Sequence, residues 1–293
     1  MKIMGFIVAS LLGTGALAQN VNYKVLKDNP ADVANFFVNV ELLEFELPIK
    51  NIKGTSFCLG LNSYANYNNK FGAEIAFRRG YLNLGGTART QFELGGFFNF
   101  KSKVKVRNQK VVLDSKEWTT NSTTYTETKF IKCPAQNLRS LGVRGGFLTN
   151  KEAYEDESGA LTGTYRYGWT GVYAGILLTS QMNYRINSDQ FGEAGAGFIR
   201  RYYADVLIHP FASLTDIEND KKATNASIGR LGFRLGLEAM PAERRKMGQA
   251  PVYFKIEVGM RPLDGIYMMG SFGVSIKRKL PKLGIQETKR ETE

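Results

Sequence analysis

The chain has 293 residues, among them 31 glycines, one histidine and two cysteines, with 12% aromatic residues and a formal net charge of +12. A chain of this length without a linker-like segment favours one domain, and one histidine leaves too few ligands for a zinc-type metal site. No phosphate-binding loop or dinucleotide fingerprint occurs in a strand-to-helix context, so we expect no cofactor.

The amino terminus has the parts of a secretory signal peptide. Lys2 precedes an apolar run at 3–17, and Ala16-Leu17-Ala18 has the Ala-x-Ala form. We expect residues 1–18 to be removed, because the run is shorter than the ~20 residues of a membrane-spanning helix. Export disfavours nucleic acid as the partner of this basic chain. Lipopolysaccharide, peptidoglycan or an acidic envelope protein then remain as partners, with a solvated charged surface as the alternative.

Residues 19–53 are expected to form a periplasmic lead-in or a first strand. Within them, 36–48 mixes valines and leucines with Glu41, Glu44 and Glu46. This pattern leaves both a first strand and a short amphipathic helix open.

Residues 54–279 carry the period-two pattern of strands. An Asn-rich turn is expected at 66–70, and the apolar parity shifts at Gly80, which predicts a β-bulge. Further strands are expected at 91–100, 138–148, 163–178 and 200–211. The third of these carries Tyr165, Tyr167, Trp169 and Tyr173, which suit either an aromatic girdle at a membrane boundary or core packing.

The strand at 91–100 continues as a row of alternating cations, Lys101, Lys103, Lys105 and Arg107. A row of like charge is costly in a hydrocarbon layer, so we expect it to project beyond the membrane in a hairpin near 101–132. We expect these four residues to contact lipopolysaccharide or a partner protein.

Three segments at 227–239, 251–262 and 266–276 show the clearest alternation. Their apolar positions are the predicted lipid-facing residues, which are Leu231, Phe233, Leu235, Phe254, Ile256, Val258, Phe272 and Val274. Their polar positions are the predicted lumen charges, which are Arg230, Arg234, Glu238, Lys255, Glu257 and Arg261. Such charges suit either a network that fills a narrow interior or a water-filled, anion-preferring pore.

These strands are close to the ~9–11 residues that a tilted strand needs to cross the hydrocarbon layer. We therefore predict an all-β fold, a single antiparallel transmembrane β-barrel of about ten strands with long polar loops. Eight and twelve strands are the alternatives. A basic polar tail follows at 280–293.

Neither the cysteines nor the histidine indicates an active site. Cys58 and Cys133 lie in an expected oxidising compartment, where a disulfide and two separate small residues of the wall are both open. His209 has Asp205 four residues before it but no Gly-x-Ser-x-Gly elbow. We interpret His209 as a structural residue instead of the base of a lipid acyl-transfer or hydrolytic enzyme, and we predict no catalytic residue and no metal site.

The signal peptide, the alternating strands and the aromatic positions together resemble small outer-membrane β-barrel proteins, such as the OmpA-like and Bacteroidota barrel families. The resemblance covers residues 54–279 and implies no enzymatic residues. The chain departs from many such proteins because a basic tail follows its closing strand. We expect a structural or accessory component of the bacterial cell envelope, located in the outer membrane, whose loops contact a partner protein or surface polysaccharide. A narrow anion-preferring porin and a secreted soluble β-sandwich binding module are the alternatives.

Overall fold

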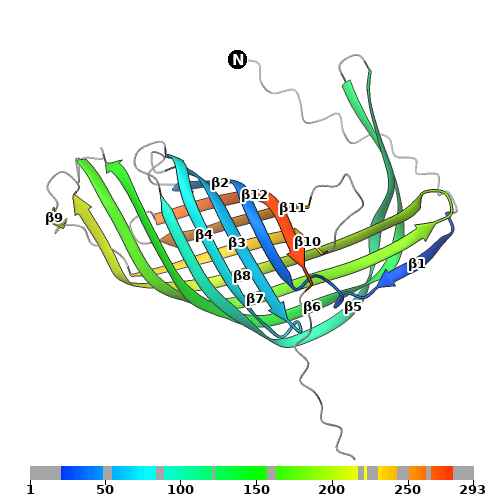
Figure 1. Cartoon of the computed structure of the whole chain (residues 1–293), viewed down its shortest axis with the longest axis horizontal. Helices are drawn as coiled ribbons and strands as arrows, with labels where there is room; N and C mark the ends of the chain where they lie inside the picture. Colours follow the sequence, from blue (N-terminus) through cyan, green and yellow to red (C-terminus); the bar gives the residue numbers. More distant parts are fainter. Residues whose placement is uncertain are drawn as a thin grey trace, which may run out of the picture.

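The computed structural model describes residues 21–48, 55–83, 89–120, 123–156, 163–216, 221–222, 230–242, 251–261 and 265–279. The predicted signal peptide and the tail at 280–293 lie outside these residues. The described chain is all-β and forms one antiparallel sheet (Figure 1). Within it there is no helix long and apolar enough to span a membrane.

The strands follow one another along the chain without an intervening helix in the described residues. They are β1 (Tyr23–Asp28), β2 (Phe36–Pro48), β3 (Ser56–Tyr67), β4 (Phe71–Asn83), β5 (Thr90–Thr120), β6 (Thr123–Asp156), β7 (Gly163–Ser188), β8 (Gly192–Asp216), β9 (Lys221–Lys222), β10 (Leu231–Pro241), β11 (Val252–Arg261) and β12 (Gly265–Arg278).

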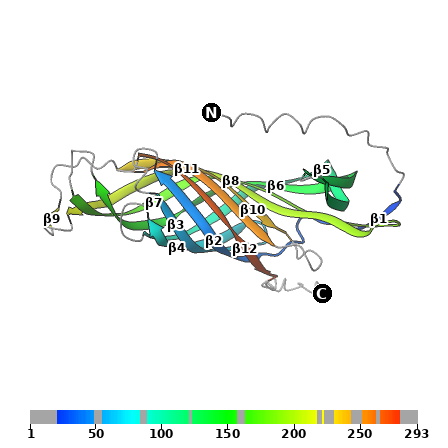
Figure 2. The same cartoon turned by 90° about the horizontal axis from the view of Figure 1, so that it is seen from above.

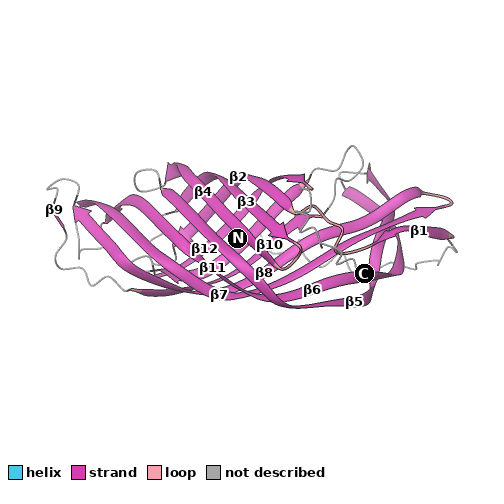
Figure 3. Cartoon of the chain, turned by 60° about the horizontal axis from the view of Figure 1, so that its bottom comes forward, coloured by secondary structure: helices cyan, strands magenta, loops and turns pink. Residues whose placement is uncertain are grey.

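Ten of these strands close into a barrel-like ring. From β2 the ring runs through β3, β4, β5, β6, β7, β8, β10 and β11 to β12, and β12 pairs with β2. Figure 2 shows β2 and β12 side by side, and Figure 3 shows strands of the two walls crossing in projection. β1 adds to β7, and the two-residue β9 adds to β8. The predicted number of about ten strands agrees with this ring.

Within the ring, alternation along the strands separates a charged inside from an apolar outside. On β11, Lys255 and Glu257 are buried while Ile256 and Val258 are exposed. Side chains from opposite walls meet within the ring, as Arg234 of β10 bonds to Glu93 of β5. The buried face of the sheet is therefore its concave, charged face.

β2 is a full member of the ring and resolves the mixed pattern at 36–48. Its pairing with β12 passes from Leu43 directly to Glu41, so Leu42 is the extra residue of a bulge. Leu42 and Leu43 are both exposed, whereas Glu41 and Glu44 are both buried. A bulge changes the parity of a strand, and this one keeps the glutamates of β2 on the inside.

Two local predictions in β3 and β4 are confirmed. The turn between these strands has Asn68 and Asn69 at φ values of 51° and 57°, a conformation that asparagine tolerates. Further along, Cys58 pairs with Gly80 and Phe57 pairs with Leu82. Tyr81 is thereby left as an extra residue, which places the β-bulge at Gly80.

The hairpin of β5 and β6 extends far beyond its neighbour β4. β4 pairs with β5 only between Thr90 and Phe98, while β5 and β6 stay paired out to Thr120 and Thr123. In Figure 1 the hairpin turns away from the line of β7 and β8. It is anchored outside the ring by a hydrophobic cluster in which Val111, Cys133 and Ala135 pack against Met182, Tyr184 and Ile186 of β7.

Residues 29–35, here called the strap, join β1 on β7 to β2 on the opposite side of the ring. The side-chain amide of Gln181 donates to the carbonyl of Pro30 at 3.0 Å. At the other end, the backbone N–H of Asn66 donates to the carbonyl of Asn35 at 2.7 Å. Val33 is buried among the interior apolar residues. The strap therefore crosses one end of the ring and is held on both sides.

Candidate functional site

Charged side chains fill the inside of the ring. Among the described residues, eight buried carboxylates face seven buried cations. They are Glu41, Glu44, Glu46, Glu74, Glu93, Asp205, Glu238 and Glu257, with Arg78, Arg89, Arg144, Arg201, Arg234, Lys255 and Arg261. Taking an ion out of water costs several kcal/mol, so each charge needs opposite charges or hydrogen bonds nearby. The near balance of sign makes such pairing possible.

One group of pairs joins the first strands of the ring. The guanidinium of Arg78 donates to both oxygens of Glu41, at 2.8 Å from Nε and 3.1 Å from Nη2, and it also contacts Glu44. Glu46 lies between two arginines, pairing with Arg89 and with Arg261 at 2.7 Å. The bulge in β2 makes this group possible, because it turns the neighbouring glutamates of β2 inward.

A second group links opposite walls. Arg234 of β10 donates to both oxygens of Glu93 at 2.7 and 3.0 Å and to Asp205 of β8 at 2.6 Å. Arg144 of β6 reaches Glu93 and Glu74, at 3.3 and 3.0 Å. Because β10 and β5 lie on different sides of the ring, the bonds between Arg234 and Glu93 brace the two walls against each other. Arg144 and Asp205 join this pair from the neighbouring strands β6 and β8.

Tyrosines fill the space between the ion pairs. The hydroxyls of Tyr203 and Tyr267 each donate to a different oxygen of Glu257, both at 2.6 Å. The guanidinium of Arg261 lies 3.7 Å from the ring centroid of Tyr267, and that of Arg144 lies 4.2 Å from Tyr203. Stacking on aromatic faces suits the weakly hydrated guanidinium, so the interior is packed as well as paired.

The structure brings five of the six predicted lumen charges into this network. They are Arg234, Glu238, Lys255, Glu257 and Arg261. Arg230 differs, since it is exposed and lies one residue before the start of β10. Arg230 is an even-numbered position like Arg234, so the pattern alone places it on the inner face. The side chains alternate between the two faces only from Leu231 onward, where β10 begins to pair with β8.

The predicted lipid-facing residues all lie on the outside. Phe233 and Phe272 are 42% and 46% exposed, and Phe254 is half-buried because its ring packs against Phe272 at 4.9 Å between centroids. Leu231, Leu235, Ile256 and Val258 are exposed, and Val274 is half-buried. The other ring strands continue this apolar belt with exposed residues such as Leu59, Ile75, Leu94, Val143 and Ile176.

The aromatic residues of β7 take the core position instead of a girdle. Tyr167, Trp169 and Tyr173 are buried inside the ring, where they pack with Leu148, Leu207 and Leu214. The expectation of a boundary girdle from these three residues is therefore wrong. Their positions share the inward parity of β7, and residue type alone did not reveal this because amphipathic aromatic rings suit a membrane boundary as well as a core.

The cysteines are both free and buried, so the disulfide interpretation is corrected. Cys58 lies in the ring wall, with its sulfur 3.9 Å from the hydroxyl of Ser56. Cys133 lies outside the ring, in the cluster between the hairpin and β7. The two thiols belong to different packing groups, which is the alternative reading of two separate small residues.

His209 is buried against Trp169, with 4.4 Å between ring centroids and an angle of 64°. Asp205 accepts a hydrogen bond from Arg234 instead of orienting the imidazole. Among the described residues, neither ring nitrogen of His209 has a hydrogen-bond partner, so neither is aligned with an acid or a nucleophile there. Within the described residues, no group of three or more His, Cys, Asp or Glu side chains is placed to hold a metal ion.

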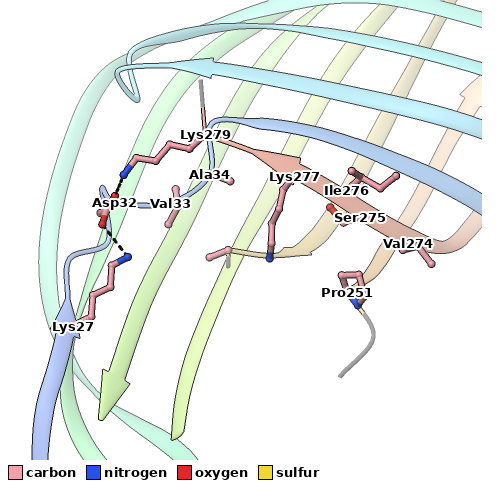
Figure 4. A pocket seen from close by; sticks show the side chains of 11 residues that line it. Lys27, Asp32, Val33, Ala34, Pro251, Val274, Ser275, Ile276, Lys277 and Lys279 are labelled. Carbon is pink, nitrogen blue, oxygen red and sulfur yellow. Dashed lines mark hydrogen bonds and ion pairs between the residues drawn. The ribbon is translucent and has the colours of Figure 1, made fainter. Parts of the chain in front are cut away.

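A pocket of about 510 Å³ lies beside the strap, between the end of β1 and the end of β12 (Figure 4). Lys27, Lys277 and Lys279 line it together with Asp32. Lys27 lies 2.9 Å from Asp32, and Lys279 contacts the other carboxylate oxygen. Hydrogen bonds from Lys279 and then Lys27 lower the pKa of Asp32 to about 2. These contacts join the strap to β1 through Lys27 and to the end of β12 through Lys279.

The cations Lys101, Lys103, Lys105 and Arg107 are exposed on the projecting part of β5. They form a surface row that is separate from the charges inside the ring. Comparison with protein-family models, curated proteins and solved structures finds no significant match for this chain.

Proposed function

We propose that the protein is an outer-membrane β-barrel that serves as a structural or accessory component of the cell envelope. The observation that carries the proposal is the inversion of the sheet: charge is inside and apolar surface is outside. A soluble β-sandwich binding module would bury its apolar faces against each other, and soluble monomers rarely expose contiguous apolar patches beyond a few hundred Å². Phe233 and Phe272 have no protein core around them.

The length of the strands and the closed pairing support the membrane location. β3, β10 and β11 have 12, 11 and 10 residues, near the ~9–11 that cross a hydrocarbon layer. A closed ring satisfies its backbone hydrogen bonds without help from water, which a sheet in lipid requires. Cleavage of residues 1–18 would accompany export across the inner membrane, which an outer-membrane location requires.

The filled interior favours a scaffold over the anion-preferring porin. Arg78, Arg89, Arg201 and Arg234 are among the largest fully buried side chains, together with Trp169 and several tyrosines. In the described part of the chain, the eight buried carboxylates outnumber the seven buried cations, which gives an anion no preference for this interior. The strap crosses one end of the ring in addition. We propose that the projecting hairpin makes the functional contacts, and we propose no enzymatic activity.

The test is extraction followed by gel migration and conductance. We expect membrane fractions to release the protein only with detergent, and the unboiled protein to migrate faster than the boiled one. In planar bilayers we expect no stable channel. Release by salt or alkali without detergent would refute membrane insertion, and large, stable, anion-selective channels would favour the porin.

A further inference from the structure

The part of β5 that projects from the ring has an unpaired edge. β4 ends its pairing with β5 at Phe98, and no strand of the described chain pairs with that edge from Lys101 to Asn108. All eight residues of 101–108, here called the bare edge, are exposed. An unpaired edge presents backbone N–H and C=O groups that can pair with another strand.

A bulge at the start of the bare edge sets which way its side chains point. Asn99 pairs with Gly142 and Lys101 pairs with Leu141, so Phe100 is the extra residue. Phe98 and its partner Val143 are on the outer face of the ring. Leu141 is two residues from Val143 and therefore lies on the same outer face. Because Lys101 pairs with Leu141, Lys101 and the alternating cations after it also lie on this outer face.

This row of cations is not neutralised within the hairpin. Residues 99–113 and 130–142 contain seven lysines and arginines and no aspartate or glutamate. Arg139, opposite Lys103, adds a further cation to the same face. Alternate residues of a strand are about 6.6 to 6.8 Å apart, so Lys101, Lys103, Lys105 and Arg107 form an evenly spaced row.

The opposite face of the bare edge is apolar at its centre. Val104 and Val106 are 47% and 66% exposed, between Ser102 and Asn108. The edge therefore offers three features at once: free backbone groups, a cationic face and a small apolar face. Each of these is what strand addition uses, because main-chain bonds give affinity and alternate side chains give specificity.

We propose that the bare edge is the docking site for an extended acidic segment of a partner protein, which adds to β5 as a further strand. Carboxylates at alternate positions would face Lys101, Lys103, Lys105 and Arg107, and apolar residues between them would cover Val104 and Val106. The proposed accessory role determines only where the partner would be located, in the cell envelope. The binding of an acidic strand is argued from the bare edge and does not depend on that role.

Charge selects this occupant over the two others that an edge strand invites. A second copy of the chain would place its own lysine row against this one, and like charges directly opposite are destabilising. Lipid headgroups would use only the cations and would leave the backbone groups and the valines uncovered. An acidic strand uses all three features.

The test uses the folded full chain in detergent and a labelled synthetic peptide of alternating glutamate and valine. Two further versions of the peptide carry N-methyl groups on one or the other alternate set of amides, so that one version loses the hydrogen bonds to β5. We expect the parent peptide to bind and to slow amide hydrogen exchange at 101–108. We also expect only one of the methylated versions to lose binding, by about tenfold or more.

The variant Lys101→Glu/Lys103→Glu/Lys105→Glu should bind the peptide at least about tenfold more weakly. Its matched control is Lys24→Glu/Lys70→Glu/Lys132→Glu, which changes the net charge equally at exposed positions off the row and should bind almost as the parent chain does. Both variants must keep the shift in gel migration on boiling, which reports the ring independently of the edge.

Three outcomes would overturn the proposal. Equal binding of both methylated peptides would reduce the contact to unspecific charge attraction. Binding of phosphatidylglycerol vesicles through the row, without binding of the peptide, would assign it to lipid headgroups. If neither probe binds, the lysines serve only to prevent the edge from pairing with other strands. If the protein binds the peptide but needs no detergent for extraction, the membrane role is refuted and the docking site is still supported.

Discussion

Arg78 and Glu41 face each other across the wall of the ring, with two parallel hydrogen bonds of 2.8 and 3.1 Å. Both side chains are almost fully buried, and Glu44 shares the same guanidinium. The pair joins β4 to β2, two strands that are not adjacent, since β3 lies between them. The pair therefore forms only when β2, β3 and β4 are packed side by side. It also depends on the bulge in β2, which turns Glu41 and Glu44 inward.

Replacing Arg78 with methionine should strongly destabilise the folded ring. The change leaves Glu41 and Glu44 buried without their cation, and breaking such a buried pair costs about 3–5 kcal/mol. The free energy of unfolding, measured with urea in detergent micelles, should fall by about this amount. Arg79→Met is the matched control, because Arg79 is the next residue and is exposed.

The triple variant Arg78→Met/Glu41→Gln/Glu44→Gln removes the orphaned charges as well and should recover most of the lost stability. If it remained as unstable as the single variant, the loss would come from packing and not from uncompensated charge. Equal effects of Arg78→Met and Arg79→Met would contradict the burial of the pair.

Gly236 gives a second prediction, because the ring of Tyr203 lies directly where a Cβ on this residue would be. Tyr203 cannot move freely, since its hydroxyl bonds to Glu257 at 2.6 Å. Gly236→Ala should therefore cost about 1–3 kcal/mol of unfolding free energy, as overpacking does. Gly168→Ala is the control, because its Cβ would meet its nearest atom at an ordinary 3.6 Å. Equal stability of the two variants would show that the tyrosine is not fixed.

The strand pattern made much of this fold predictable. In β10, β11 and β12 each strand keeps one parity through its paired length, so the inside and outside residues could be assigned correctly. The exception, Arg230, lies before the first paired residue of β10. Parity carries information only within the paired length of a strand.

A pattern of period two does not encode bulges, contacts between strands far apart in the sequence, or the choice between a core and a membrane boundary. In β2 the extra Leu42 reverses the parity, so the sequence resembled a mixture of strand and helix. The partners Arg234 and Glu93 are 141 positions apart and meet only because the ring closes. On β7, Trp169 and Tyr173 suit a membrane boundary as well as a core, and residue type alone did not distinguish the two.

Asp32 predicts how the stability of the strap depends on pH. Lys279 and Lys27 hold its pKa at about 2, below the ordinary 3.8. A lowered pKa in the folded state means that the contribution is complete above about pH 4 and is lost as the pH falls toward 2. Because the side chain of Asp32 is 34% exposed, we expect only about 0.2–1 kcal/mol. Asp32→Asn should thus lower the unfolding free energy at pH 7 and leave it unchanged near pH 2. An equal loss at both values would contradict the ionic contact.

Cys58 and Cys133 provide a direct chemical check on where the chain is packed. Both thiols are free and have no exposed surface, one in the ring wall and one beneath the hairpin. Without any reductant, the folded protein should take up no maleimide label, and the urea-unfolded protein should take up two. Ser115→Cys, at an exposed position of the hairpin, should add one label in the folded state.

The order of labelling then separates the two regions. Cys133 is covered by contacts between the hairpin and β7, whereas Cys58 is covered by the ring itself. At intermediate urea concentrations Cys133 should be labelled first, because releasing the hairpin requires fewer contacts to break than opening a closed ring. Mass spectrometry of the peptides identifies which thiol reacts. A mass corresponding to a linked Cys58–Cys133 pair, or earlier labelling of Cys58, would contradict this arrangement.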